Sequence, residues 1–329
     1  MTDALFRNNA ERIVLADVGG TYARFAVLTA GALGPIDHMA VRDHRRFSDA
    51  LSAFMARQTD RATISTAILA VAGVVERERC ALTNNPWVIE AAELRARFGF
   101  ADVHIINDFE AVAWALPEIT RNDLRQVGGG APVTEAPMAV LGPGTGFGVA
   151  VYVPRLERGF VLRSEGGHST VPSSSMREDA IIEALRQRIG HVSIERVLSS
   201  GGLENLYRAI AALDSVTVPE RTAPEITQAA VAGSCVACCA ALDVFCALLG
   251  EVSGNFALSF GAQGGVFIAG GIVQHFRDYL AQSHFRARFE AKGRQRPYLE
   301  AIPVYLILRD DPAFIGLRSL AGLRALAAG

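Results

Sequence analysis

Apolar runs separated by glycine turns open the chain and predict paired strands. The runs over residues 13–18 and 23–28 flank a Gly19-Gly20 turn, and this spacing predicts a β-hairpin. A further apolar run over 36–41 predicts a third strand. The first forty residues are therefore expected to form three strands.

Helices and strands alternate over the rest of the first 118 residues. Apolar spacing predicts, in chain order, a helix over 48–57 with Ser48 as its N-cap, a strand over 66–71, a helix over 91–98, a strand over 103–106 and a helix over 109–116. The resulting order is β-β-β-α-β-α-β-α. This alternation is typical of an α/β layered domain with a partly parallel sheet, whose antiparallel edge is the opening hairpin.

A boundary is expected after the helix that Pro117 ends. Polar residues, three consecutive glycines at 128–130 and two prolines precede a new apolar strand over 138–141. This strand begins a second strand-glycine-strand unit over 140–151, which is similar to the opening hairpin. The two hairpins favour a duplicated fold, although two unrelated glycine turns would give the same pattern.

The second half is rich in helices. The predicted elements are helices over 176–189 and 203–212, an apolar helix over 226–260, a strand over 266–269 followed by Gly270-Gly271, a helix reaching about residue 289, a strand over 303–308 and a helix over 313–327. The helix over 226–260 is apolar on nearly all sides, so we expect it to lie in a core.

Length and composition indicate a globular protein of about two domains. The chain has 329 residues, of which 50% are hydrophobic and 20% are charged. Its 32 basic and 34 acidic side chains give a net charge of −2, which argues against broad binding to nucleic acid or to an anionic membrane. Acidic residues among the first twenty argue against a secretory signal, and glycines interrupt the uncharged stretch over 252–276. We therefore expect a cytoplasmic protein without a membrane span.

Most of the cysteines are close together in the sequence. Four of the five, Cys235, Cys238, Cys239 and Cys246, lie in one apolar helical run. Disulfide frameworks instead use pairs that are spread along the chain. We interpret these residues as reduced core thiols in preference to a metal site.

The first glycine turn combines a carboxylate, two glycines and a hydroxyl: Asp17, Gly19, Gly20 and Thr21. Backbone N–H groups of such a turn can surround phosphate oxygens, and the carboxylate can hold Mg²⁺ directly or through water. A glycine hairpin capped by an Asx turn would use the same residues without any ligand. This turn is a candidate phosphate site that needs further support.

The second glycine turn, over 142–148, contains four glycines and a threonine, which is more than a tight turn needs. We expect a second backbone cradle there. The turn lacks the lysine of a P-loop and does not open a helix as a dinucleotide fingerprint does. Lys292, the single lysine of the chain, lies far downstream, so a bound phosphate must be held by backbone dipoles and a metal ion.

Asn107 and Asp108 follow a buried strand and begin a helix. Asp108 is either the helix N-cap or a strand-end group that faces a cleft and accepts a proton from a hydroxyl. Asn84-Asn85 either adds amide groups beside that cleft or forms an ordinary turn. These residues are candidates for acid–base chemistry and for binding a polar substrate.

Glu165 and His168 are separated by two glycines, and Glu195 follows further along the chain. Carboxylates accept hydrogen bonds from sugar hydroxyls and a neutral imidazole can donate or accept, so these groups suit a polyol. Zinc is an alternative ligand, but one histidine and two glutamates without a cysteine pair are weak support for it. A surface loop with helix-capping glutamates is the remaining alternative.

Taken together, these motifs resemble the bacterial glucokinase family. The resemblance runs in order from Asp17 to about Pro312 and rests on residues 17–21, 83–84, 106–112, 142–148, 165–168, 189–193 and 270–273. It implies a two-domain actin-like (ribonuclease H-like) ATPase fold with an interdomain cleft. The small α/β domain would comprise residues 1–118, rejoined by the C-terminal segment 310–329, and the large α/β domain residues 119–309. A homodimer is the common state of soluble enzymes of this kind.

The resemblance also implies a reaction, in which the γ-phosphoryl group of MgATP is transferred to the 6-hydroxyl of glucose with Asp108 as the catalytic base. Sugar contacts are implied for Asn84, Asn107, Asp108, Glu165, His168 and Glu195. ATP contacts are implied for Asp17, Gly19, Gly20, Thr21, Gly144, Thr145, Gly146, Gly270 and Gly271. Asp17 would in addition hold Mg²⁺, directly or through water.

The sequence departs from the family pattern at Tyr22, at Asn85-Pro86 and at Ser200-Gly201-Gly202, which concern the sugar pocket and the nucleotide-side loop. A kinase for another hexose or an amino sugar on the same fold is an alternative function. A sugar-responsive transcription regulator would need a DNA-binding module, which we do not expect in the sixteen residues before Asp17. An actin-like chaperone switch would hydrolyse ATP with water and would not need the carboxylates and imidazole described above.

Overall fold

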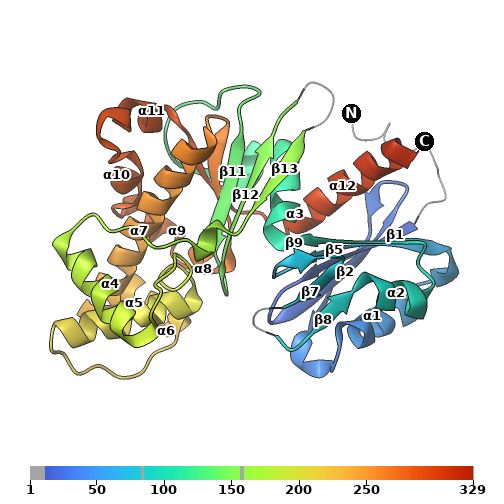
Figure 1. Cartoon of the computed structure of the whole chain (residues 1–329), viewed down its shortest axis with the longest axis horizontal. Helices are drawn as coiled ribbons and strands as arrows, with labels where there is room; N and C mark the ends of the chain where they lie inside the picture. The colour runs from blue at the N-terminus through green and yellow to red at the C-terminus, as the bar shows by residue number, and fades with distance from the viewer. Residues whose placement is uncertain (1–11, 83–84, 156–158, 329) are drawn as a thin grey trace. The chain divides into compact units, whose positions relative to one another are not determined.

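The computed structural model describes residues 12–82, 85–155 and 159–328, which form a mixed α/β chain with several sheets (Figure 1). The chain divides into two compact units. Unit 1 comprises the described residues of Met1–Ile119 and Asp310–Gly329, and unit 2 comprises Thr120–Arg309. The C-terminal segment therefore folds in the same unit as the N-terminal strands.

Unit 1 is built on one main sheet and a small separate sheet. The strands are β1 (Arg12–Val18), β2 (Tyr22–Thr29), β3 (Ala32–Leu33), β4 (Asp37–Ala40), β5 (Ile64–Val71), β6 (Val75–Glu76), β7 (Arg79–Ala81), β8 (Val88–Glu90) and β9 (Asp102–Asn107). The core order is β2-β1-β5-β9, and β3 and β4 pair with β2. β1 pairs antiparallel with β2, as the opening apolar runs predict, whereas β1, β5 and β9 run parallel. β6, β7 and β8 form the small sheet.

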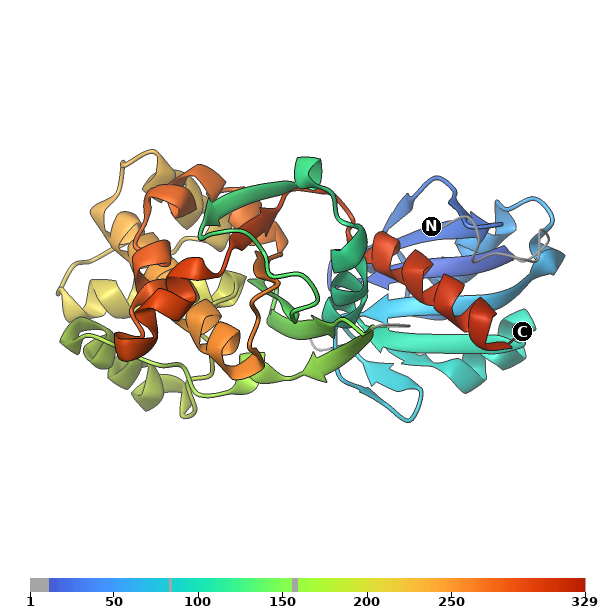
Figure 2. The same ribbon diagram turned by 90° about the horizontal axis from the view of Figure 1, so that it is seen from above.

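Helices cover both faces of the main sheet of unit 1 (Figure 1). They are α1 (Phe47–Ala56), α2 (Ala91–Phe98), α3 (Asp108–Ala115) and α12 (Ala313–Ala328). Apolar side chains of α1 and α2 share one core with alternate strand residues such as Val14 and Leu69. α12 packs at an angle against α3 (Figure 2), so closely that a Cβ at Gly316 would be 1.7 Å from Ala111 O. Burial on both faces explains why β1 and β5 are continuous apolar runs.

Unit 2 is built on a second sheet with a matching core. Its strands are β10 (Leu124–Gly128), β11 (Met138–Pro143), β12 (Phe147–Val153), β13 (Phe160–Ser164), β14 (Gly265–Ile268) and β15 (Val304–Ile307), in the order β10-β15-β14-β11-β12-β13. β11 and β12 pair antiparallel, and β11, β14 and β15 run parallel. From β12 to β15, order and direction match those of β2, β1, β5 and β9 in unit 1. This match supports the duplication that the two glycine hairpins favour.

A long apolar helix, α7, lies in the core of unit 2. The helices are α4 (Met176–Ile189), α5 (Ser200–Leu213), α6 (Ala223–Val231), α7 (Val236–Phe260), α8 (Gly271–Gln274), α9 (Arg277–Gln282), α10 (Phe285–Glu290) and α11 (Arg296–Ala301). Among the described residues, α7 is long and apolar enough to cross a membrane, but 67% of its apolar window is buried, as expected for a core helix. α10 crosses it closely, because a Cβ at Gly250 or Gly254 would lie 2.1 or 2.5 Å from a carbonyl oxygen of α10.

Two long predicted helices are broken in the structure. The prediction of one helix over 226–260 is wrong, because α6 ends at Val231 and α7 begins at Val236, with Gly233 between them at a left-handed φ of 66°. The predicted helix from Gly271 to about residue 289 is three short helices, α8, α9 and α10. Apolar residues continue across both breaks, so periodicity alone does not reveal them.

The prediction that Ser48 is a helix N-cap is also wrong. α1 begins at Phe47, and no side chain caps its N-terminus. Ser48 is buried in the first turn, where its Oγ accepts a hydrogen bond from Arg97 Nη1 at 2.9 Å. The Ser48 hydroxyl therefore binds Arg97, which is distant in sequence, and does not cap the helix as the local sequence pattern predicts.

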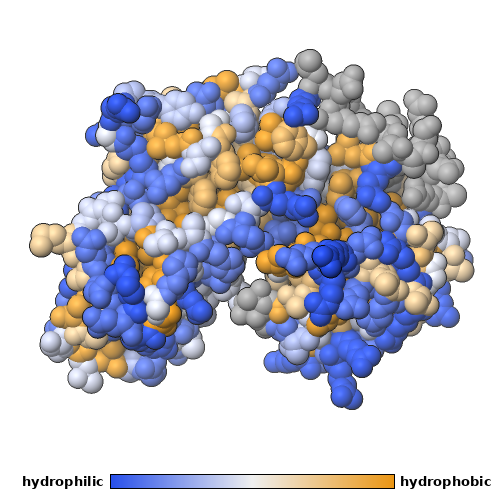
Figure 3. Space-filling view, viewed as in Figure 1, coloured by the Kyte–Doolittle hydropathy of each residue, from blue (hydrophilic) through white to orange (hydrophobic). Residues whose placement is uncertain are grey.

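Several short or exposed strands, namely β3, β6, β7, β8, β10 and β13, are not predicted by the apolar pattern. β13 forms one edge of the unit 2 sheet and exposes 37% of Phe160 and 46% of Leu162. Figure 3 shows hydrophobic residues over this part of unit 2, and the Arg155 guanidinium lies 4.7 Å from the centre of the Phe160 ring. Among the described residues, the remaining regular elements are six short 3-10 helices in the connections of the two units. They span Val41–Asp43, Arg61–Thr63, Leu116–Glu118, Arg121–Asp123, Gly166–His168 and Gly293–Gln295.

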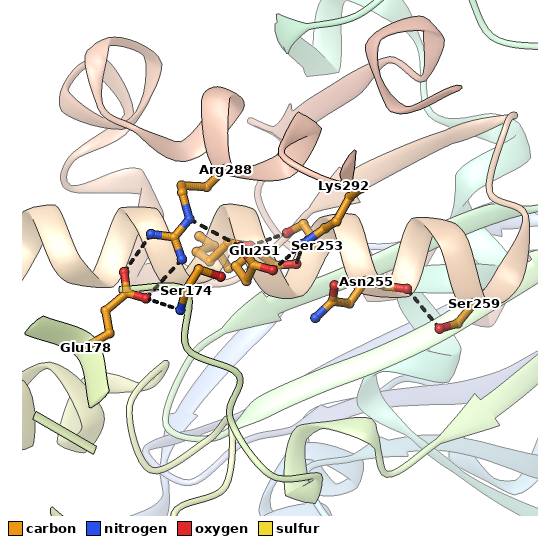
Figure 4. Close-up of polar contacts among 9 residues, drawn as sticks. Ser174, Glu178, Glu251, Ser253, Asn255, Ser259, Arg288 and Lys292 are labelled. Atoms are coloured by element: carbon orange, nitrogen blue, oxygen red, sulfur yellow. Dashed lines mark hydrogen bonds and ion pairs between the residues drawn. The ribbon is translucent and has the colours of Figure 1, made fainter. Parts of the chain in front are cut away.

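Four buried charged side chains, which we refer to as the ion cluster, connect three helices of unit 2 (Figure 4). Arg288 of α10 donates two hydrogen bonds to Glu178 of α4, at 2.6 and 3.0 Å, and one to Glu251 of α7 at 3.2 Å. Lys292 also binds the Glu251 carboxylate. The side chains are between 6% and 19% exposed, and their formal charges sum to zero.

Candidate active site

The candidate residues of unit 1 follow the carboxyl ends of two of its three parallel strands, β1 and β9. Val18, Val71 and Asn107 lie in register on β1, β5 and β9. The first glycine turn, after β1, and Asp108, after β9, therefore lie at the same edge of the sheet. Ligand groups commonly gather at this edge of open α/β sheets.

Asp17 lies near the end of β1, directly opposite Arg24 on β2. Arg24 Nη1 donates to Asp17 Oδ2 at 2.8 Å, and Arg24 Nε lies 2.9 Å from Asp311 Oδ1. His38 Nε2 is 3.5 Å from Asp311 Oδ2 and adds positive charge only when it is protonated. Burial raises the pKa of Asp17, although the charge of Arg24 opposes this shift. Two carboxylates share one guanidinium, and the surplus of negative charge suits a bound cation.

The first glycine turn is open on one side. Gly19 N donates to Tyr22 O at 3.0 Å, which closes the turn between β1 and β2. A Cβ at Gly19 would meet only Tyr22 O, at an ordinary distance of 3.5 Å, and Gly19 does not have a left-handed φ. Neither packing among the described residues nor backbone conformation therefore requires glycine here. The open face permits close approach of a ligand to the backbone.

Asn107 is the N-cap of α3, so the alternative in which Asp108 has this role is wrong. Asn107 Oδ1 accepts from Phe109 N at 2.9 Å and from Glu110 N at 3.3 Å, and its Nδ2 donates to Gly73 O at 3.2 Å. Asp108 occupies the first helical position, is half-buried and accepts from Phe109 N at 3.0 Å. The backbone on both sides of the Asp108 carboxylate is thus fixed by hydrogen bonds.

The second glycine turn is held by two other segments of unit 2. Gly144 N donates to Gly146 O at 2.8 Å, and Ser200 N, at the start of α5, donates to Gly144 O at 2.9 Å. Gly270 has a left-handed φ of 106°, and a Cβ there would lie 2.0 Å from Pro143 O. The turn, the N-terminus of α5 and the segment after β14 are therefore neighbours.

At three glycines in these segments, neither close packing within the described chain nor a left-handed backbone conformation requires the absence of a side chain. A Cβ at Gly144, Gly201 or Gly271 would meet nothing within 4 Å among the described residues, and these residues do not have a left-handed φ. We refer to this open face as the glycine surface. The N-terminus of α5 lies beside it; although Ser200 N and Gly202 N are bonded within the chain, the positive end of the helix dipole favours a bound anion. The sequence indicates Ser200-Gly201-Gly202 only as a departure from the family pattern; of its two glycines, Gly201 is open and Gly202 packs against Val197.

Glu195 and the Glu165–His168 segment pack against the second glycine turn. Glu195 Oε2 accepts from Phe147 N at 3.0 Å, and a Cβ at Gly146 would be 2.4 Å from that oxygen. Glu195 N donates to Gly167 O at 2.9 Å, and a Cβ at Gly167 would be 2.1 Å from Phe147 O. The glycines at 146 and 167 therefore allow three separate segments of unit 2 to meet.

The side chains of this second group are accessible. His168 Nε2 lies 3.8 Å from Glu165 Oε2, and the two side chains are 56% and 55% exposed. Both can therefore form hydrogen bonds with a polar molecule in solution. Glu195 is half-buried and holds the backbone of the turn as described above.

The structure gathers the predicted site residues into two groups, one in each unit. Unit 1 contains Asp17, Gly19, Gly20, Thr21, Asn107 and Asp108, and unit 2 contains Gly144, Thr145, Gly146, Glu165, His168, Glu195, Gly270 and Gly271. Asn84 lies outside the described residues. Asn85 Oδ1 accepts from Trp87 N at 2.9 Å, as in an ordinary turn, and Tyr22 is 47% exposed.

Comparisons with known proteins agree over nearly the whole chain. The Glucokinase family model matches residues 14–323. A glucokinase of Nitrobacter hamburgensis is 41% identical over 307 residues, which cover 93% of this chain and 96% of that protein.

Solved structures of sugar kinases have a similar fold. A glucokinase from an Antarctic psychrotroph has a TM-score of 0.81 at 34% identity, covering 94% of this chain and 98% of that chain. A ROK family glucokinase from Streptomyces griseus, in complex with glucose and AMPPNP, has a TM-score of 0.63 at 18% identity, covering 94% of this chain and 98% of that one. The second likeness is one of fold alone.

These matches include both groups of candidate residues and confirm the resemblance that the motifs indicate. They favour a kinase over a transcription regulator or a chaperone switch, because the matched family model and the curated relatives are glucokinases. The chain belongs to the glucokinase family of ATP-dependent hexose kinases.

Proposed function

We propose that Asp108 accepts the proton of the glucose 6-hydroxyl as the γ-phosphoryl group of MgATP is transferred to that oxygen. The products are glucose 6-phosphate and ADP. The observation that carries this role is the place of Asp108: Asn107 caps α3, and Asp108 stands at the same sheet edge as the open glycine turn. A loose transition state requires little of the base, so a carboxylate that orients the hydroxyl and accepts its proton late is sufficient.

The glycine surface supports a role for Gly144, Thr145 and Gly146 in binding ATP phosphates. Backbone N–H groups and the N-terminus of α5 supply positive partial charge there without a lysine. Gly270-Gly271 adjoins this turn and is the segment we assign to the adenosine. In unit 1, the open face of Gly19 supports phosphate contacts from the turn that ends at Thr21.

Gly144→Ala tests the phosphate role. We expect the KM for ATP to rise about tenfold, equal to about one lost charge-assisted hydrogen bond, while the unfolding midpoint stays unchanged because the added Cβ meets nothing. Gly142→Ala is the matched control. Its Cβ would lie 1.8 Å from Ala269 O, so this variant is expected to lose stability instead. An unchanged KM for ATP in folded Gly144→Ala would remove Gly144 from the phosphate site.

The surroundings of Asp17 fit Mg²⁺. This ion usually takes one or two protein carboxylates together with waters and substrate phosphates. No cluster of three or more His, Cys, Asp or Glu side chains is present in the part of the chain that the structure describes, so a cage built by the protein is not the arrangement we propose. Bound at Asp17, directly or through water, Mg²⁺ would offset charge on the ATP phosphates. Asp17 itself is held in place by Arg24.

For the sugar, we propose contacts from the amides and carboxylates that resemble the family pattern: Asn84, Asn107, Asp108, Glu165, His168 and Glu195. The exposure of Glu165 and His168 supports this role. Glu195 has two carboxylate oxygens and can therefore hold the second glycine turn while accepting a sugar hydroxyl. The complex of the Streptomyces griseus glucokinase with glucose and AMPPNP is consistent with these two substrate classes on this fold.

The finer description of fold and assembly is also a proposal. The matching sheets of the two units support a duplicated, two-domain actin-like ATPase fold. Its domains would be residues 1–118 with 310–329 and residues 119–309. We further propose a homodimer in the cytoplasm, and sedimentation of the purified chain at catalytic concentrations tests the first part of this proposal.

ADP release with MgATP tests the proposed substrate. The acceptors are glucose, mannose, fructose and N-acetylated hexosamines at equal concentration, with a reaction that lacks sugar as the control. We expect release with glucose well above all others. Release with a different sugar alone would favour the alternative, a kinase for another hexose or an amino sugar, and release without sugar would contradict both.

A further inference from the structure

Two cysteines three residues apart stand at the start of α7. Cys235 is at the N-cap position, outside the helix, with φ −146° and ψ 114°. Cys238 is in the first turn and completely buried, whereas Cys235 is partly exposed. Cys235 is a free thiol, as the apolar run predicts, but it packs at the edge of the core and not inside it. One residue of the pair is therefore partly exposed to solvent, and the other is buried.

The two sulfurs are chemically unequal. The pKa of the Cys235 thiol is lowered, chiefly by its interaction with the neighbouring Cys238 thiol. The backbone N–H groups of Ala237 and Cys238 and the charge of Arg221 act in the same direction. Burial raises the pKa of Cys238 to about 12. This asymmetry is the one found in C-x-x-C pairs that exchange with disulfides.

Arg221 adds an independent observation at this place. Its Nε is buried and has no hydrogen-bond partner within the described part of the chain. The positive charge of Arg221 acts to lower the pKa of Cys235, of Cys238 and of Tyr207. The guanidinium therefore lies near the cysteine pair. A partly buried guanidinium whose Nε has no hydrogen-bond partner among the described residues is stabilised by an anion nearby, and a thiolate at Cys235 supplies one.

The approach to Cys235 is open. Val231 at the end of α6 and residues 232–234 in the junction to α7 are exposed, and Val236 is 88% exposed. The third cysteine of the run, Cys239, is directed to a different partner, because its Sγ contacts Ala230 O at 3.6 Å. Cys239 is therefore a natural control, adjacent in sequence but outside the pair.

We propose that Cys235 and Cys238 form a thiol–disulfide exchange site that takes small-molecule disulfides of the glutathione type. The Cys235 thiolate attacks one sulfur of the disulfide, forms a mixed disulfide and releases the first thiol as its thiolate. The Cys238 thiol then loses its proton and attacks the Cys235 sulfur, which forms the intramolecular disulfide and releases the second thiol. Two protein thiols are oxidised and one external disulfide is reduced to two thiols, so electrons and protons balance.

This site is independent of glucose phosphorylation, so its test does not rely on activity. The full chain is incubated with oxidised glutathione, and intact mass and peptide mapping identify the products. We expect the unmodified chain to lose two hydrogen atoms and to contain a Cys235–Cys238 bond. Cys238→Ser should retain one glutathione on Cys235, because the second step is blocked, and Cys235→Ser should react at neither position. Cys239→Ser should behave as the unmodified chain does.

A disulfide that maps to another pair, or equal loss of the reaction in Cys239→Ser and Cys235→Ser, would overturn the proposal. Circular dichroism and thermal melting of each variant show whether a failure to react reflects unfolding. A second measurement does not need any variant. The rate of Cys235 alkylation by iodoacetamide is followed against pH, and we expect its midpoint below the usual thiol range of about 8–9. A midpoint within or above that range would equally contradict the proposed exchange.

Discussion

Two carboxylates, one in each unit, are similarly buried and each has an arginine partner, but their pKa values are shifted in opposite directions. Asp17 and Glu251 are 13% and 10% exposed, and each is hydrogen-bonded to an arginine. The pKa of Asp17 is nevertheless raised by burial, whereas the pKa of Glu251 is lowered although burial opposes this. Exposure and the presence of one arginine therefore do not decide whether a carboxylate favours its charged form.

The two carboxylates differ in the number of cations that surround them. Arg24 serves both Asp17 and Asp311, so two carboxylates share one permanent positive charge. In the ion cluster, Arg288 and Lys292 balance Glu178 and Glu251, and the charges of Lys292 and Arg288 outweigh the desolvation of Glu251 (Figure 4). In the balanced cluster Glu251 favours its charged form, and loss of either cation would leave a buried charge uncompensated. An unbalanced cluster costs stability and is retained where a ligand supplies the missing charge.

The largest expected effect is on stability, when Lys292 is replaced by methionine. This variant leaves the ion cluster with two carboxylates and one cation, the same count as at Asp17. Removal of one member of a buried pair typically costs about 3–5 kcal/mol, and we expect a loss of this size in the free energy of unfolding. Urea unfolding measures it. Turnover per folded molecule should be retained, because Lys292 is not among the site residues.

Arg296→Met is the matched control for Lys292→Met. It breaks the pair with Glu300 on the neighbouring helix α11, where the two side chains are 64% and 46% exposed. Exposed pairs contribute little, so this variant should unfold close to the unmodified chain. Equal losses in the two variants would show that burial of the cluster does not matter.

Next in size is the loss of activity in Asp108→Asn. We expect kcat to fall at least roughly 10²-fold, as when a general base is removed, while glucose binding remains measurable. Stability should change little, since Asn107 rather than Asp108 caps α3. Single-turnover kinetics and isothermal titration with glucose give the two quantities. Turnover close to normal would remove Asp108 from the role of base and would leave the sheet edge of unit 1 without a catalytic group.

Much of this edge is predictable from the sequence, because its signals are local. The apolar runs that end at Val18, Leu141 and Ile106 form most of β1, β11 and β9, and the glycine turns and Asn107-Asp108 follow these runs directly in the chain. Short-range physical rules relate these residue types to strand ends and helix starts. The sequence therefore predicts both candidate groups, apart from the open glycine at 201.

The ion cluster and the helix breaks are not predictable in this way. Glu178 and Arg288 are 110 residues apart, and only the packing of α4, α7 and α10 brings them together. The junction at Gly233 is flanked by apolar residues, so the pattern continues where the helix does not. Pairing at long range and a break inside an apolar run both depend on tertiary contacts that local composition does not encode.

A smaller effect on activity is expected for Asp17→Asn. This variant tests whether Asp17 serves catalysis, whereas Glu251 serves stability. The kcat/KM should fall about tenfold, the loss of about 1.4 kcal/mol of transition-state stabilisation. Stability at pH 7 should be equal to or above that of the unmodified chain, because the substitution removes a charge that burial disfavours. Asp311 still pairs with Arg24 in this variant. A clear loss of stability with full activity would make Asp17 a structural residue like Glu251.

The smallest effect is the pH dependence of unfolding, and it has opposite signs for the two carboxylates. The folded pKa of Glu251 is lowered from 4.5, so its contribution is present above pH 4.5 and is lost as pH falls through the folded value. The folded pKa of Asp17 is raised from 3.8, so its contribution is present below pH 3.8 and is lost as pH rises through the folded value.

Urea unfolding of Glu251→Gln and Asp17→Asn between pH 3.5 and 7 measures both contributions against the unmodified chain. The stability deficit of Glu251→Gln should shrink on acidification, by about 1.4 kcal/mol for each unit by which the pKa is lowered. The relative stability of Asp17→Asn should grow as pH rises. Parallel curves for the two variants would mean that both carboxylates titrate alike, and the count of cations around each would then not explain their behaviour.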